Sequence, residues 1–164
     1  MKRLILMRHA KSDWSDITAS DHERALNTRG RHDAHIMGDW MSAQALQPDH
    51  VLCSDATRTR ETLAGLSLDD VRITFTRSLY LAEPDVMSRA LHTRDESCVL
   101  IIAHNPGCGM LANMLLAHIP KHAQFNSYPT GATLVADFNI PRWQDLRHHT
   151  GSVIHFCVPR DLTV

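Results

Sequence analysis

The chain has 164 residues, of which 43% are hydrophobic and 21% are charged, a balance typical of a globular domain. Seventeen Lys and Arg residues against eighteen Asp and Glu residues give a formal net charge of −1. This balance excludes a protein that binds nucleic acid through bulk positive charge, so we expect no nucleic-acid partner. The length indicates one domain over residues 1–164, with a core that needs neither disulfides nor metal.

The first apolar run, residues 4–7, ends at Arg8-His9 and is too short for a signal peptide or a membrane span. The four cysteines are scattered along the chain without paired spacing. We therefore expect a cytoplasmic protein with no membrane partner, whose cysteines are reduced thiols and mostly small buried residues.

Short apolar runs alternate with segments of helical periodicity from one end of the chain to the other. Strands are expected, in chain order, at residues 4–7, 51–53, 71–75, 98–103, 132–138 and 152–158. Residues 98–103 are apolar throughout, which is typical of a parallel strand covered on both faces. The alternation predicts an α/β fold, a three-layer α/β/α sandwich around a mostly parallel central sheet.

Helices are expected between these strands, each with a recognisable start signal. The expected starts are Asn27 or Thr28 for a helix that ends at Gln47-Pro48, Ser54 or Asp55 for one that ends near residue 65, Glu83-Pro84, and Asn105-Pro106. Two long loops remain, residues 8–26 and residues 117–131. A polar loop as long as the first one is usually functional in a compact domain.

Basic residues follow three of the predicted strands where each strand ends. Arg8-His9 ends the first strand, Arg58 lies in the first turn of the helix after the second, and His104 ends the most apolar one. Ligands of open α/β sheets bind outside the carboxyl ends of the strands. A cation in a first helical turn opposes the helix dipole unless an anion such as phosphate lies there too. Each residue alone is more often a solvated helix-end residue, but together the three predict an anion site.

Three motifs resemble those of the histidine phosphatase superfamily: Arg8-His9-Ala10-Lys11-Ser12, Ser54-Asp55-Ala56-Thr57-Arg58 and His104-Asn105-Pro106-Gly107. With Leu26-Asn27-Thr28-Arg29-Gly30 and Tyr128-Pro129-Thr130-Gly131-Ala132, the sequence is most similar to the small SixA-type phosphohistidine phosphatases. Ala10 replaces the glycine that commonly follows the Arg-His pair. The resemblance implies a phosphoglycerate mutase-like fold without the cap domain of larger members, for which this chain has no room.

The resemblance also implies that His9 is the nucleophile and forms a covalent phosphohistidine, while Arg8, Arg58 and His104 bind the phosphoryl group. The second ring nitrogen of His9 must then be held as a donor, and a backbone carbonyl is the expected partner. The two arginines, with His104 if it is protonated, supply the charge that Mg²⁺ supplies elsewhere. We therefore expect no metal and no cofactor.

The proton donor is less well defined. Larger relatives use a carboxylate, and we assign that role to Glu83, although a residue before Pro84 is equally typical of a helix start. Asp16 and Asp21 in the long loop are rival candidates. A phosphoramidate leaving group needs little help from an acid, so a site without one would itself indicate phosphohistidine.

We expect a metal-independent phosphatase that hydrolyses phosphohistidine on proteins or a related phosphomonoester. Two alternatives stay open: a phosphoryl-binding module with little or no turnover, and a small-molecule phosphomonoesterase of the same superfamily. The short chain favours an open site and a phosphorylated protein as partner. Residues 11–26 are then a docking edge, or else a lid over a small phosphorylated substrate.

Other chemistries fit less well. Residues 107–112 match the dinucleotide pattern G-x-G-x-x-A, but the acidic residue expected about twenty positions later is missing. The spacing between Cys53 and Arg58 is one residue too short for a cysteine-dependent phosphatase. The histidines outside the three motifs lack the spacing of a zinc site.

Overall fold

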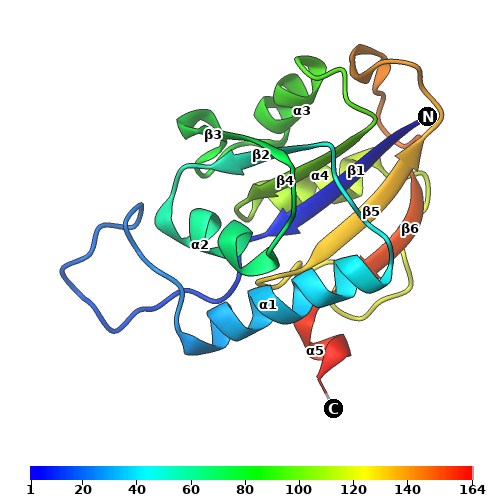
Figure 1. Cartoon of the computed structure of the whole chain (residues 1–164). Coiled ribbons are helices and arrows are strands. Elements are labelled where there is room, and N and C mark those ends of the chain that lie inside the picture. Colours follow the sequence, from blue (N-terminus) through cyan, green and yellow to red (C-terminus); the bar gives the residue numbers. More distant parts are fainter. Residues whose placement is uncertain (164) are drawn as a thin grey trace.

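Six strands form one mixed sheet (Figure 1). The structure is a computed structural model and describes residues 1–163. The strands are β1 (Lys2–Arg8), β2 (His50–Ser54), β3 (Arg72–Thr76), β4 (Cys98–Ala103), β5 (Thr133–Phe138) and β6 (Ser152–Cys157). Their order across the sheet is β3-β2-β4-β1-β5-β6. Strands β3, β2, β4 and β1 are mutually parallel, whereas β5 runs antiparallel to both β1 and β6. The mostly parallel sheet is therefore confirmed.

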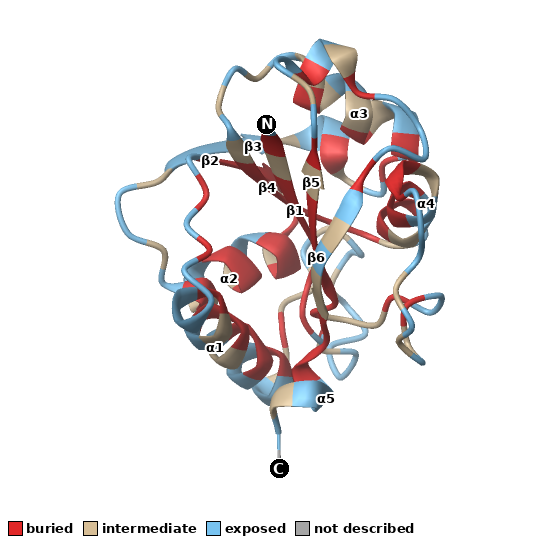
Figure 2. Ribbon diagram, turned by 90° about the vertical axis from the view of Figure 1, so that its right-hand side faces the viewer, coloured by how far each residue is buried: buried red, intermediate tan, exposed pale blue. Residues whose placement is uncertain are grey.

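Helices cover both faces of this sheet, as the three-layer prediction requires (Figure 2). The helices are α1 (Thr28–Ala43), α2 (Thr57–Leu66), α3 (Pro84–His92), α4 (Gly107–Leu115) and α5 (Pro159–Leu162), with 3-10 turns η1 (Arg77–Leu79) and η2 (Trp143–Asp145). Helices α1 and α2 lie on one face, and α3 and α4 lie on the other. No cap domain is inserted within residues 1–163. None of the helices described there is long and apolar enough to cross a membrane.

The central strands bury side chains alternately on the two faces. In β1, Ile5 and Met7 pack on the side of α1 and α2, while Leu4 and Leu6 pack on the side of α3 and α4. All four are 0% exposed. Burying one such side chain contributes about 1.5–3 kcal/mol. Burial of β1 therefore fixes the position of its carboxyl end, where Arg8 and His9 lie.

Several predicted boundaries were wrong. Helix α1 ends at Ala43 rather than at Gln47-Pro48, because the chain reverses through a left-handed residue at Ala45, with φ 55°. Neither Ser54 nor Asp55 caps α2, whose N-cap is Ala56 without a side-chain hydrogen bond. Those two polar side chains are used elsewhere in the site. In contrast, Asn27 caps α1 as predicted and accepts a hydrogen bond from the backbone N–H of Gly30 at 2.7 Å.

Candidate active site

The three central parallel strands bring the predicted basic residues to one edge of the sheet. β4 lies between β1 and β2, so the chain segments that follow these strands meet. They surround a cavity of about 330 Å³ whose lining residues are Arg8, His9, Lys11, Ser12, Trp14, Asp21, Arg24, Arg58, Leu81, His104, Asn105 and Thr130. Arg8, His9, Arg58 and His104 all line it. The structure thus places together the four residues on which the sequence argument rests.

The imidazole of His9 is held with one nitrogen available as a nucleophile. Its Nδ1 lies 2.7 Å from the backbone carbonyl of Ala10 and donates to it. Nε2 therefore carries a lone pair, and the Nε–H of Arg58 donates to it at 3.3 Å. Burial, together with the charges of Arg58 and Arg8, lowers the pKa of His9 to about 4. The ring is consequently neutral at physiological pH, the state that a nucleophile requires.

The backbone around His9 is fixed by hydrogen bonds from three other elements. The N–H of His9 donates to Ala103 at the end of β4, and that of Ala10 donates to the hydroxyl of Thr62 on α2. The N–H of Gly131 donates to the carbonyls of both Arg8 and His9, at 3.1 and 2.9 Å. Gly131 has φ +77°, a conformation that favours glycine. The motif Tyr128-Pro129-Thr130-Gly131-Ala132 therefore has a structural role, because its glycine holds the backbone of Arg8 and His9.

A second glycine holds the segment after the nucleophile against helix α1. A Cβ added at Gly30 would lie 2.0 Å from the carbonyl oxygen of Lys11. The same carbonyl accepts a hydrogen bond from the N–H of Asn27. The motif Leu26-Asn27-Thr28-Arg29-Gly30 therefore has a structural role, in that it packs the start of α1 against the chain just beyond His9.

Arg8 and His104 both have buried nitrogen atoms without a hydrogen-bond partner. The Nη1 group of Arg8 donates to the carbonyl of Tyr128 at 3.2 Å, but its Nε has no partner. The Nε2 of His104 lies 2.8 Å from the hydroxyl of Ser54, whereas its Nδ1 has no partner. Buried polar groups usually have a partner, which can be another protein group, an ordered water or a bound ion. These atoms fit a phosphate, whose oxygens accept hydrogen bonds from several directions.

His104 is expected to be neutral at physiological pH. Burial lowers its pKa to about 3, with His9 and Arg58 contributing in the same direction. The positive charge of the site at neutral pH therefore comes from its arginines and Lys11. His104 is then a neutral hydrogen-bond donor through Nδ1 when the hydroxyl of Ser54 donates to Nε2.

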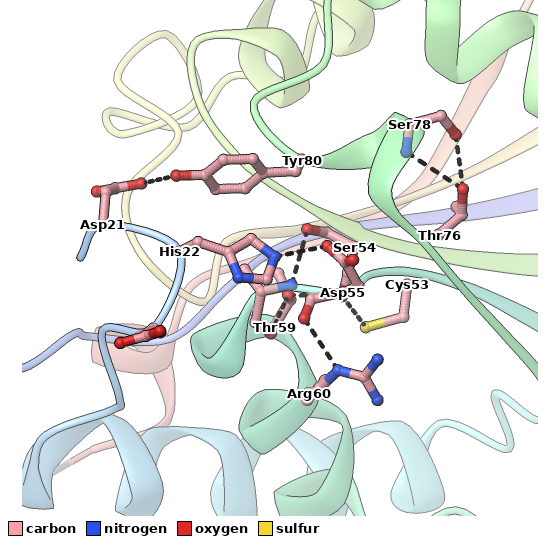
Figure 3. Close-up of polar contacts among 12 residues, drawn as sticks. Asp21, His22, Cys53, Ser54, Asp55, Thr59, Arg60, Thr76, Ser78 and Tyr80 are labelled. Atoms are coloured by element: carbon pink, nitrogen blue, oxygen red, sulfur yellow. Dashed lines mark hydrogen bonds and ion pairs between the residues drawn. The ribbon is translucent and has the colours of Figure 1, made fainter. Parts of the chain in front are cut away.

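The anion expected next to Arg58 is present as part of the protein itself. Arg58 lies in the first turn of α2, and its Nη1 and Nη2 groups donate to the carbonyl and the carboxylate of Asp21 at 2.5 and 3.1 Å. The hydroxyl of Tyr80 also donates to this carboxylate (Figure 3). These hydrogen bonds lower the pKa of Asp21 to about 2, so its carboxyl group is ionised. Asp21 thus accepts hydrogen bonds from guanidinium N–H groups of Arg58 that could otherwise bind a phosphate.

The long loop between β1 and α1 forms a wall of the cavity and is anchored beside Asp21. In Figure 1 this loop extends from the body next to α2. Nε2 of His22 forms a hydrogen bond of 2.7 Å with the carboxylate of Asp55, so this carboxylate contacts the loop rather than the N-terminus of α2 (Figure 3). The ring of Tyr80 stands edge-on to the rings of both His22 and His104, with centroids at 4.8 and 5.4 Å. The loop tip remains open to solvent, and Ile17 is 94% exposed.

The structure does not bring Glu83 to the cavity. Glu83 is exposed at the N-cap position of α3 and is not among the lining residues, whereas Leu81 is. The chain turns at Leu81, which has a left-handed φ of 51°, two residues before Glu83. Asp16 is also outside, because its carboxylate closes a turn with Thr18. Of the three candidate carboxylates, Asp21 lines the cavity.

Sequence reasoning missed Ser54 as the partner of His104 and Tyr80 as the partner of Asp21 and His104. The sequence pattern predicts a helix cap at Ser54, whereas its place at the end of a central strand is the signal for a role in the site. Tyr80 follows η1, far from any motif, and carries no such signal. Its role depends on tertiary contacts with the loop.

We expect replacement of Asp21 by asparagine to tighten the binding of inorganic phosphate roughly fivefold, the equivalent of about 1 kcal/mol. The variant removes the negative charge that competes for Arg58 and retains the shape of the side chain. The inhibition constant of phosphate measures the effect. Asp16→Asn, in the same loop but outside the cavity, is the matched control. Weaker phosphate binding in Asp21→Asn would show that Asp21 is not a competing anion.

Comparisons with known proteins identify the family to which this chain belongs. The family model of the histidine phosphatase superfamily (branch 1) matches residues 4–83. An uncharacterised protein of Mycobacterium leprae is 31% identical over 162 residues, which cover 94% of this chain and 100% of that one. The chain belongs to the histidine phosphatase superfamily.

Solved structures with the same fold include proteins of the SixA group. One, from Nakamurella multipartitia and provisionally named phosphohistidine phosphatase SixA, is 25% identical with a TM-score of 0.85, covering 96% of each chain. Another, the protein histidine phosphatase SixA complexed with tungstate, is 22% identical with a TM-score of 0.79, covering 98% of this chain and 99% of that one. The fold is therefore the phosphoglycerate mutase-like fold, in the compact form that SixA proteins share.

Proposed function

We propose that this phosphatase hydrolyses phosphohistidine on proteins through a covalent phosphohistidine intermediate on His9. The observation that carries the proposal is the orientation of His9. Its Nδ1–H is bound by the Ala10 carbonyl, so that the lone pair of Nε2 faces a cavity shared with Arg8, Arg58 and His104. Phosphoryl transfer requires mainly positioning and charge neutralisation, and these four residues supply both.

The reaction proceeds in two displacements. When substrate binds, the Nε–H of Arg58 switches its hydrogen bond from Nε2 of His9 to a phosphoryl oxygen, which frees the lone pair of Nε2. Nε2 then attacks phosphorus, the bond from phosphorus to the leaving group breaks, and Arg8, Arg58 and His104 bind the equatorial oxygens. A water molecule then attacks the phosphorus of the phosphoenzyme, and one of its protons passes to a phosphoryl oxygen. The bond between phosphorus and Nε2 breaks, inorganic phosphate leaves, and His9 is regenerated in its neutral form. The hydrogen bond from Nδ1 to Ala10 keeps the ring in one orientation through both steps.

The state of Asp21 favours phosphohistidine over an alkyl phosphate. An alkoxide leaving group needs a protonated acid, but the carboxyl group that lines this cavity is ionised and bound to Arg58 and Tyr80. A phosphohistidine whose other ring nitrogen is protonated leaves as neutral imidazole and needs no such acid. The chemistry of the lining thus fits a phosphoramidate.

The surroundings of the cavity favour a protein as the carrier of the phosphoryl group. Trp14 lines the cavity and is 67% exposed, with its ring 3.6 Å from the guanidinium carbon of Arg24. The cavity is therefore bordered by an exposed aromatic side chain, which a partner surface can contact while the phosphoryl group enters the cavity. A protein surface provides the additional contact area that a small sugar phosphate lacks.

The test is a comparison of kcat/KM for a histidine-phosphorylated protein with values for several sugar phosphates and an aryl phosphate. We expect the phosphorylated protein to be hydrolysed with the highest kcat/KM. If kcat/KM for one sugar phosphate is higher by orders of magnitude, the proposal of a protein substrate is overturned. The loop of residues 11–26 would then be a lid over a small substrate. Binding of every phosphorylated compound without turnover would favour the phosphoryl-binding module instead.

We expect activity to survive removal of divalent metal ions. Arg8 and Arg58 line the cavity and neutralise the negative charge of the phosphoryl group. Other phosphoryl-transfer sites use Mg²⁺ for this purpose. The measurement is kcat/KM after dialysis against a chelator, with and without added Mg²⁺, Mn²⁺ or Zn²⁺. Loss of activity that one of these ions restores would contradict the expectation.

A further inference from the structure

A second, larger hollow lies directly beside the phosphate cavity. It has a volume of about 750 Å³ and lies between α4 and the loop that follows it. Its lining residues are Asn105, Pro106, Gly109, Met110, Asn113, Met114, Asn126 and Ser127. Helix α4 covers the sheet face opposite to α1 and α2 (Figure 2). We call this hollow the α4 groove.

The α4 groove and the phosphate cavity share Asn105, which forms the boundary between them. The side chain of Asn105 is fixed on both sides: its Nδ2 donates to the carbonyls of Ser127 and Tyr128, and its Oδ1 accepts from the N–H of Gly109. The Tyr128 carbonyl also accepts from Arg8 in the phosphate cavity. A rigid boundary therefore joins the groove to the phosphate-binding residues.

The two hollows differ sharply in charge. The phosphate cavity is lined by arginines, Lys11 and Asp21, whereas every residue that lines the α4 groove is uncharged. Met110 and Met114 supply apolar surface, and Met110 is 47% exposed. Methionine suits a surface that accommodates varied partners because it is flexible and polarisable. Asn113 and Asn126 add amide groups that can pair with a peptide backbone.

We infer that the α4 groove binds the uncharged polypeptide segment that flanks the phosphohistidine of a protein substrate. The inference rests on the proposed function and identifies where this phosphatase distinguishes a protein from a small phosphate. Five of the lining residues are exposed, namely Pro106, Met110, Asn113, Asn126 and Ser127. A small apolar molecule in so open a groove would keep much of its surface in water, whereas a polypeptide covers the groove with its own chain. The phosphoryl group occupies the charged cavity, and the neighbouring residues cross Asn105 into the uncharged groove.

The test uses Met110→Ala with two substrates that share the same leaving group: free phosphohistidine and a synthetic peptide with a central phosphohistidine and uncharged, apolar flanks. We expect kcat/KM for the peptide to fall about tenfold, because truncation removes the exposed apolar contact. The value for free phosphohistidine should not change. Ile119→Ala is the matched control, since Ile119 is also apolar and 52% exposed but does not line the groove.

The outcomes separate the inference from the proposed function. If Met110→Ala lowers kcat/KM for both substrates equally, or for neither, the groove does not bind the flanking segment. Naphthyl phosphate is assayed as a third substrate. If Met110→Ala lowers kcat/KM for naphthyl phosphate and not for the peptide, the occupant is a small aryl group and the inference is overturned. If the unmodified enzyme hydrolyses an aryl phosphate but neither phosphohistidine substrate, the proposed function itself fails.

Discussion

Replacement of His9 by alanine should reduce turnover by about four orders of magnitude or more, to the background of the assay. The variant removes the nitrogen that forms the bond to phosphorus. The remaining groups of the cavity could still bind phosphate, but without a nucleophile the double displacement cannot start. Steady-state rates on an aryl phosphate and on phosphohistidine measure the effect.

The structure suggests why this variant should remain folded. His9 is 6% exposed and borders the cavity, and its backbone hydrogen bonds to Ala103 and Gly131 do not involve the side chain. The inhibition constant of phosphate and a thermal unfolding curve check this. His35→Ala, on the exposed face of α1, is the matched control. Full activity of His9→Ala would eliminate the mechanism.

Replacement of Arg58 by alanine should lower kcat/KM on the order of 10³-fold. Its guanidinium lies against Nε2 of His9 and is almost fully buried, with 5% of the residue exposed. Water does not screen it there, so its interaction with the transferring phosphoryl group is strong. Arg58→Lys should recover only part of the loss, because lysine retains the charge but not the planar fork.

Arg60 provides the control for Arg58 on the same helix. It is exposed, donates to the carbonyl of Asp55, and its guanidinium carbon lies 4.0 Å from the centre of the Phe75 ring. Arg60→Ala should leave kcat/KM within about twofold, the range of an ordinary surface substitution. Equal losses in Arg58→Ala and Arg60→Ala would show that Arg58 acts through helix stability rather than on the substrate.

The sequence was sufficient for the parts of the fold that depend on local patterns. The apolar run of β4 was predicted residue for residue, because a strand buried on both faces leaves a continuous signal. Arg8, His9, Arg58 and His104 could be placed at one edge because parallel neighbouring strands share that edge. The carbonyl partner of His9 was also expected, and Ala10 supplies it.

The parts that failed depend on contacts between distant segments. The assignment of Glu83 as proton donor rests on its place in the sequence, but Leu81 lines the cavity and Glu83 does not. The left-handed turn at Leu81 leaves no signal in the local sequence pattern. Asp21 was one of the candidate proton donors, but nothing in the sequence was a reason to prefer it. Its contacts are with Arg58 and Tyr80, which lie 37 and 59 residues further along the chain. Helix α5 was missed because four residues carry no detectable periodicity.

The most direct test of the mechanism is to trap the phosphoenzyme. The enzyme is mixed with a ³²P-labelled substrate, quenched in alkali within the first turnover, digested, and the labelled peptide is identified by mass spectrometry. We predict an acid-labile, alkali-stable phosphoryl group on His9, present in the unmodified protein and in His104→Ala but absent from His9→Ala. Turnover without any phosphoenzyme, or a label on His104 instead of His9, would contradict the account.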